Sequence, residues 1–119
     1  MAKPSPEELY DLGMLSYDKQ DFSKARKYFE KACGLNNGGG CSNLGALYYN
    51  GEVVEKDLIK AAYFYSKACE LNNGDGCGAL GGLYYNGDGV KQDSKKAAAL
   101  FEKACKLGDQ LACEALKEK

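Results

Sequence analysis

The stretch Cys33–Gly51, CGLNNGGGCSNLGALYYNG, returns 36 residues later as Cys69–Gly87, CELNNGDGCGALGGLYYNG, with fourteen of nineteen positions identical. The same shift aligns the six cysteines in two sets of three: Cys33, Cys69, Cys105 and Cys41, Cys77, Cys113. Self-similarity at a fixed period of this length is typical of proteins that stack one supersecondary unit several times. The sequence therefore predicts a repeat protein with three equivalent cysteine pairs.

Each unit carries a helical pattern, in which apolar residues recur at i, i+3, i+4 and i+7 and so mark one face of a helix. The three sets are Ala25, Tyr28, Phe29, Ala32; Ala61, Phe64, Tyr65, Ala68; and Ala97, Leu100, Phe101, Ala104. An aspartate stands four residues before each first alanine, where its carboxylate can accept a free backbone N–H. These N-cap candidates are Asp21, Asp57 and Asp93.

The ends of these helices are marked as well. We expect them near Leu35, Leu71 and Leu107, each followed by a residue that easily adopts a left-handed conformation: Asn36, Asn72 and Gly108. Asn37, Asn73 and Asp109 would then cap the next helix. Helices joined this closely must be antiparallel neighbours. The expected fold is all-α, an α/α solenoid of three helical hairpins (residues 6–36, 37–72 and 73–108) with a capping helix over 109–119, in a single domain of residues 1–119.

The composition argues against several classes of function. Sixteen Lys and Arg against seventeen Asp and Glu give a net charge of −1, which lacks the basic excess that nucleic-acid binding needs, so we expect no nucleic-acid partner. No apolar stretch approaches the roughly 18 residues of a spanning helix, and we expect no membrane insertion. The chain has no His, so His-containing metal sites and Ser–His or Cys–His nucleophiles are excluded, and we expect no metal and no cofactor.

The motifs resemble known repeat families. Leu12-Gly13, Ser16-Tyr17 and the run Phe22 to Ala32 resemble a tetratricopeptide (TPR) unit, with an internal loop four residues shorter than in the later units. Those later units, with Gly51–Asp57 and Gly87–Asp93 as their longer loops, resemble Sel1-like repeats. With the paired cysteines added, the whole chain is similar to the secreted cysteine-rich Sel1-like (Hcp-type) family.

We interpret the six cysteines as structural. In each pair the first lies in the last turns of one helix and the second, eight residues on, in the first turns of the next. We therefore predict the disulfides Cys33–Cys41, Cys69–Cys77 and Cys105–Cys113, with Cα atoms roughly 5.5–6 Å apart. Three disulfides favour an oxidising compartment, secreted or periplasmic, and a signal peptide would then have preceded Met1, since none is visible. The bridges would also offset Gly38-Gly39-Gly40, which costs a helix start about 2–3 kcal/mol relative to alanine.

Candidates for catalysis are few. Ser16-Tyr17-Asp18-Lys19 matches the S-x-x-K string of penicillin-recognising enzymes, but the chain has neither an S-D-N nor a K-T-G partner. The competing interpretation gives Ser16 the core position that Tyr48 and Tyr84 fill later, and we predict no catalytic residue. The resemblance to the Hcp-type family implies penicillin binding and slow β-lactam hydrolysis. We expect Val54 and Val90 to fill the gap between the two helices of a hairpin, and Gly87-Asp88-Gly89-Val90 to be a tight turn.

Binding is expected on the inner face of the curved stack, which its first helices line. By the TPR pattern, residues one, four and five places after Gly13, Gly45 and Gly81 face this groove, with Ser42 and Gly78 widening its floor and Tyr10 in their place in the first unit. The predicted groove residues are Tyr10, Met14, Tyr17, Ser42, Tyr49, Asn50, Gly78, Tyr85 and Asn86, together with Asp18, Ala46 and Gly82. Tyrosine offers rigid amphipathic contact area and asparagine can pair with an extended backbone. Tyr48 and Tyr84 compete with their neighbours for the core, and a helix-ending role competes for Asn50 and Asn86.

Three functions follow from these patterns. The first is a monomeric, non-enzymatic scaffold that binds a protein or peptide segment in the groove. The second is weak penicillin-binding or β-lactamase activity, implied by the family resemblance alone. The third is an engineered or hybrid TPR/Sel1-like protein without a natural ligand, which the close repeat identity and the mixed repeat lengths also fit.

Overall fold

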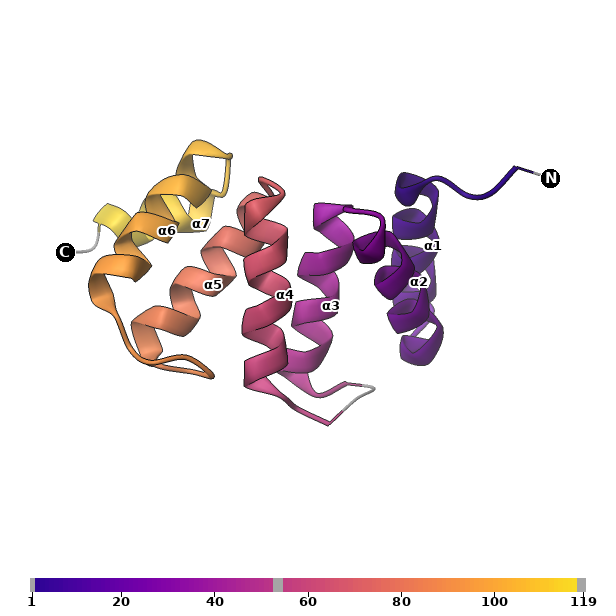
Figure 1. Cartoon of the computed structure of the whole chain (residues 1–119), viewed down its shortest axis with the longest axis horizontal. Coiled ribbons are helices and arrows are strands. Elements are labelled where there is room, and N and C mark those ends of the chain that lie inside the picture. The colour runs from indigo at the N-terminus through magenta and orange to yellow at the C-terminus, as the bar shows by residue number, and fades with distance from the viewer. Residues whose placement is uncertain (1, 53–54, 118–119) are drawn as a thin grey trace.

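The computed structural model of the chain describes residues 2–52 and 55–117 and contains seven helices in that part (Figure 1). They are α1 (Pro6–Asp18), α2 (Phe22–Gly34), α3 (Gly38–Asn50), α4 (Leu58–Glu70), α5 (Gly74–Asn86), α6 (Ser94–Lys106) and α7 (Gln110–Lys117). Successive helices pack side by side in a row that measures 51 × 29 × 21 Å. The predicted all-α solenoid of three hairpins and a capping helix is confirmed.

The predicted start and stop residues set the helix boundaries. The side chains of Asp21, Asp57 and Asp93 each accept a backbone N–H three residues on, at the first turns of α2, α4 and α6. At the other ends Asn36, Asn72 and Gly108 have φ values of 66°, 62° and 99°. The reversal is therefore made by residues that tolerate the left-handed region.

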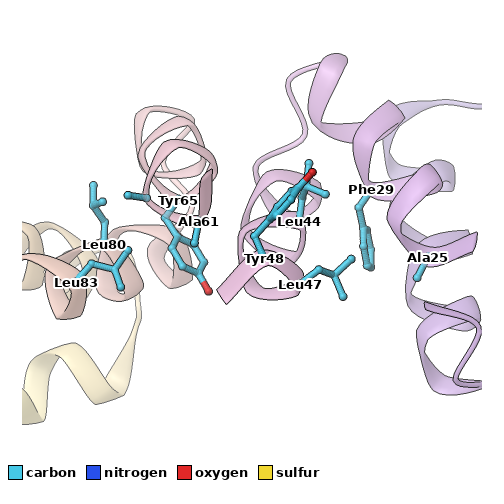
Figure 2. Packing of buried hydrophobic residues seen from close by; sticks show 10 residues of the cluster. Ala25, Phe29, Leu44, Leu47, Tyr48, Ala61, Tyr65, Leu80 and Leu83 are labelled. Atoms are coloured by element: carbon cyan, nitrogen blue, oxygen red, sulfur yellow. The ribbon is translucent and has the colours of Figure 1, made fainter. Parts of the chain in front are cut away.

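The main core cluster is a strip of buried residues that runs from α2 to α5. It includes Phe29, Leu44, Leu47, Ala61, Tyr65 and Leu83, which come from successive helices (Figure 2). Gly13, Gly45 and Gly81 lie against the rings of Phe29, Tyr65 and Phe101, and an added Cβ would come within 2.5, 2.9 and 2.9 Å of those rings. These glycines thus let the aromatic side chain of the second helix rest directly on the backbone of the first.

All three predicted disulfides are present, and no cysteine is free. Their Cα atoms lie 4.6, 4.5 and 4.8 Å apart, closer than we expected from sequence. At the first two bridges neighbouring glycines permit the close approach, because a Cβ on Gly40 would lie 2.8 Å from the Cβ of Ala32, and one on Gly76 only 2.5 Å from that of Ala68. Each bridge fastens the second helix of one hairpin to the first helix of the next.

The triple glycine packs closely against neighbouring helices. A Cβ on Gly39 would meet the Tyr10 ring at 2.8 Å, and one on Gly38 would meet Asn73 at 3.0 Å. The run therefore fits close packing on several sides at once, which gives a structural reason for the three glycines.

One of the two valines predicted to fill the gap within a hairpin lies in the part of the chain that the structure describes. Val90 is partly buried against the core, as expected, whereas Val54 lies outside the described residues. Gly89 has a φ of 73° and leaves no room for a Cβ beside the carbonyl of Leu58, which accounts for the glycine in this tight turn.

Candidate peptide-binding groove

The first helices of the hairpins line one side of the row. α1 contacts α3, and α3 contacts α5, while the second helices make no comparable contact with one another in the described ranges. Because these alternate helices touch one another, their side of the row is the shorter side. The row therefore curves toward the first helices. This shorter side is the inner face, and on it we locate the predicted groove residues.

Met14 and Tyr17 border a hollow of about 200 Å³ between α1 and α3. Its other walls are Phe29, Asn43 and Ala46. The Asn43 amide lies 3.0 Å from the Met14 sulfur, a weak acceptor. An amide held this way keeps a donor and an acceptor near an apolar hollow, an arrangement suited to a peptide group beside an apolar side chain.

Tyr17 is tied to the loop after α3. Its hydroxyl donates to both carboxylate oxygens of Glu52 at 3.1 Å, and its ring meets Phe22 edge-on at 5.0 Å. Burial raises the pKa of Tyr17, and the hydrogen bond and negative charge of Glu52 raise it further. Sequence reasoning missed Glu52 because its partner lies 35 residues away and no local pattern links them.

Within each tyrosine pair the second member is the exposed one. Tyr48 is buried and stacks on Phe64 at 5.7 Å, while 37% of Tyr49 is exposed, with the Lys56 ammonium 5.7 Å from its ring centre. Tyr84 packs partly buried against the core, whereas Tyr85 is 60% exposed. Tyr49 and Tyr85 therefore have surface free for a ligand.

A second hollow, of about 270 Å³, lies beside Tyr85. α6 contributes Ser94, Ala97, Ala98 and Phe101, and α7 contributes Ala115 and Leu116. The sequence predicts only a capping role for residues 109–119, although the apolar pair Ala115 and Leu116 is the signal that could have indicated this contribution.

The remaining predicted groove residues lie in less open places. Ser42 is buried, Tyr10 covers Gly39 and packs 6.1 Å from the Phe29 ring, and Gly78 lies against the Asp109 carboxylate at the edge of a separate depression. Asn50 donates to Glu52 at 3.4 Å. Asn50 and Asn86 are the last residues of α3 and α5, each before a left-handed glycine, which supports the helix-ending interpretation.

The S-x-x-K string occupies an ordinary helical position. Ser16 is buried, and its hydroxyl donates to the Leu12 carbonyl at 2.8 Å. Ser16 and Lys19 border a shallow hollow on the outer side of α1, but no described side chain is hydrogen-bonded to the Ser16 hydroxyl as a base. The described residues also contain no cluster of potential metal ligands, and none of their helices is long and apolar enough to cross a bilayer.

A row of antiparallel helical hairpins with its first helices on the inner side defines a helical-repeat protein of the TPR and Sel1 type. Residues 6–38 match the tetratricopeptide repeat, and residues 39–73 and 74–109 match the Sel1 repeat. The chain belongs to the Sel1 repeat family and is close to the cysteine-rich Hcp proteins of Helicobacter, with a TPR-like first repeat.

Among solved structures, the chain is similar to Helicobacter pylori cysteine rich protein B, with 44% identity, a TM-score of 0.80, and coverage of 91% of this chain and 88% of that one. A Sel1 repeat protein from Oxalobacter formigenes, at 23% identity, a TM-score of 0.87 and coverage of 96% and 89%, shares the fold. The Helicobacter pylori protein named "Putative beta-lactamase HcpC" is 59% identical over 58 residues, which are 49% of this chain and 20% of that protein. The chain thus spans only a small part of this relative.

Proposed function

We propose that the protein is an interaction module that binds an extended protein segment along the inner face of α1, α3 and α5. The proposal depends on two hollows and one exposed ring: a hollow between α1 and α3, a second hollow where α5 meets α6 and α7, and the exposed Tyr49 on α3. Sel1 and TPR repeats are typically protein-interacting, and a curved stack of hairpins offers an extended surface of this kind.

The chemistry of the face describes the segment. The hollows are mainly apolar and open, so each suits one medium-sized apolar side chain of the segment. The Asn43 amide supplies paired donor and acceptor groups for a peptide backbone beside the first hollow. The Lys56 ammonium beside Tyr49 favours a carboxylate on the segment at its middle.

The proposed setting is extracytoplasmic, either secreted or periplasmic. Three disulfides with no free cysteine support it, because such bonds persist in oxidising compartments. The similarity to the cysteine-rich Hcp proteins points the same way.

The experiment selects binding peptides from a displayed random library against the oxidised chain, and then titrates the selected peptides with variants. Tyr85→Ala should weaken binding by about tenfold or more if the ring is a central contact. Tyr63→Ala is the matched control, since Tyr63 is 64% exposed on α4, away from the first helices. Equal affinity for the Tyr85 variant and the parent, or equal losses with both variants, would contradict the groove.

Weak β-lactam binding or hydrolysis is the second candidate, supported by the names of the relatives and by no catalytic arrangement. A chromogenic cephalosporin tests it on the purified chain. Turnover that disappears in Ser16→Ala would support the S-x-x-K mechanism, turnover that survives would exclude that mechanism, and no turnover would end the hydrolytic form of this candidate.

A further inference from the structure

The face of α1 at the N-terminal end of the row carries a stripe of four residues at one-turn spacing: Glu8, Leu12, Leu15 and Lys19. They follow one another at intervals of four, three and four residues, so they share one face of the helix. The last of them, Lys19, is the C-cap residue of α1. Leu12 is 37% exposed and Leu15 is 50% exposed. We call these four residues the α1 stripe.

The same two leucines are buried in every later hairpin. Leu44 and Leu80, the counterparts of Leu12, are 1% and 6% exposed, and Leu47 and Leu83, the counterparts of Leu15, are 1% and 3% exposed. There the leucines belong to the core strip that joins one hairpin to the preceding one (Figure 2). The α1 stripe therefore presents an interface-forming leucine pair on the surface.

The residues beside the leucines indicate which partner fits. In the later hairpins the counterpart of Glu8 is Gly40 or Gly76, at which a Cβ would lie 2.8 or 2.5 Å from an alanine of the preceding helix. Glu8 has a long side chain and cannot make that approach. A hairpin packed as inside the solenoid is thus a poor partner for α1, and a different geometry is required.

The charges at the two ends of the α1 stripe indicate that geometry. The stripe runs from an acidic residue at its N-terminal end through two leucines to a basic residue at its C-terminal end. When two such stripes pair antiparallel, Leu12 of each copy meets Leu15 of the other. Glu8 of each copy likewise meets Lys19 of the other. We propose that α1 is a self-association surface, and that two chains pair through antiparallel α1 helices about a two-fold axis between Leu12 and Leu15.

The surface beside the stripe has room for the partner's leucine. A hollow of about 100 Å³ between α1 and α2 is lined by Leu12, Leu15, Ser16, Lys24 and Tyr28 among others. An inserted leucine side chain would lose its contact with water and lie against two leucines and a tyrosine ring. The Glu8 carboxylate accepts the backbone N–H of Ser5 at 2.9 Å, and hydrogen bonding with Ser5 holds the pKa of Glu8 below its ordinary value.

The pairing is weak and independent of the proposed peptide groove. One pair of short helices buries less than the roughly 1,200 Å² of a standard interface, so a dissociation constant in the range of about 10⁻⁵ to 10⁻³ M is expected. Met14 and Tyr17 lie on another face of α1, so a dimer leaves both inner faces open. This inference differs from the sequence-based expectation of a monomer.

Sedimentation equilibrium of the full oxidised chain tests the proposal at low salt, from about 10 μM to about 1 mM. The average mass should rise above the 12.9 kDa of one chain as concentration increases. Leu15→Lys should weaken association by at least about tenfold, and Lys19→Glu by about 5- to 30-fold because it faces Glu8 of the second copy. Adding Glu8→Lys to Lys19→Glu should restore the pairing.

Ile59→Lys is the matched control, because Ile59 is 73% exposed on α4 and lies outside the stripe. Its association should equal that of the parent chain. The proposal is wrong if the parent stays at 12.9 kDa throughout, if Ile59→Lys dissociates the chain as strongly as Leu15→Lys, or if the double charge reversal fails to recover what the single reversal loses. Helical circular dichroism of each variant confirms that a loss is not unfolding.

Discussion

The second and third disulfides should fail in different ways when they are removed. Cys69–Cys77 joins two thirteen-residue helices in the middle of the row, with Cys69 and Cys77 5% and 0% exposed. Cys105–Cys113 instead fastens the eight-residue α7, which packs mainly on α6 and buries only Ala112 fully. The bond at the centre supports a shared interface, and the bond at the end supports one short helix.

The magnitude follows from the loop that each bridge closes. For cysteines eight residues apart, the chain-entropy estimate is about 2.5 kcal/mol of unfolding free energy. Replacing Cys69 and Cys77 with alanine should therefore lower the melting temperature by about 10–15 °C. In the Cys105→Ala/Cys113→Ala variant we expect a smaller shift, because a helix shorter than about 12 residues is marginal in water and α7 separates from a stack that stays folded.

Hydrogen exchange followed by mass spectrometry distinguishes the two outcomes, with thermal melts of both variants alongside. The Cys105→Ala/Cys113→Ala variant should lose amide protection in α7 while α3 and α4 keep theirs. The Cys33→Ala/Cys41→Ala variant is the control and should behave like the central pair. Retained protection of α7, or equal losses of global stability from the central and terminal pairs, would refute the reasoning.

Three further predictions concern single side chains. Burial, with a contribution from Tyr49, raises the pKa of Tyr65 from 10.0 to about 12. The folded state therefore favours the neutral phenol, and stability that is fully present below pH 10 is lost as the pH rises toward 12, by about 2–3 kcal/mol. Urea unfolding should show this loss in the parent and in the exposed-site control Tyr63→Phe, and a clearly smaller loss in Tyr65→Phe. Gly81→Ala should destabilise the chain by about 1–3 kcal/mol, since its Cβ would press on the Phe101 ring at 2.9 Å, whereas Gly82→Ala, with nothing within 4 Å, should be neutral or stabilising by up to about 1 kcal/mol. Denaturant midpoints that move alike in both glycine variants would contradict the packing argument. Glu52→Gln should lower the pKa of Tyr17 in an ultraviolet titration, because the negative charge that helps to raise it is gone, and an unchanged value would mean that burial alone sets it.

The fold was predictable because its determinants are local. Each helix start depends on one capping side chain such as Asp57, each helix end on one left-handed residue such as Asn72, and each disulfide on two cysteines eight residues apart. These features lie within about one turn of where they act, so the repeat pattern shows them directly.

The candidate site was harder to predict because it depends on how neighbouring hairpins meet. The bond from Tyr17 to Glu52 and the contact of Asn43 with Met14 join residues 35 and 29 positions apart. Tyr10 and Ser42 occupy a repeat position that is predicted to line the groove. In the structure, however, Tyr10 packs against Gly39 of α3, and Ser42 is buried. Repeat periodicity gives a side chain's face on its own helix, but not the side chains that the next hairpin lays over it.

The eight-residue spacing of the cysteines also bears on how the protein is made. For every cysteine the native partner is its closest neighbour in the chain, since the next alternative for Cys41 is Cys69, 28 positions away. Short loops close most often in an unfolded polypeptide, so random collisions already favour the native bonds. Oxidation can then begin before the row of helices has assembled and in any order. Refolding from the reduced state should accordingly pass through few scrambled isomers and depend little on a disulfide isomerase.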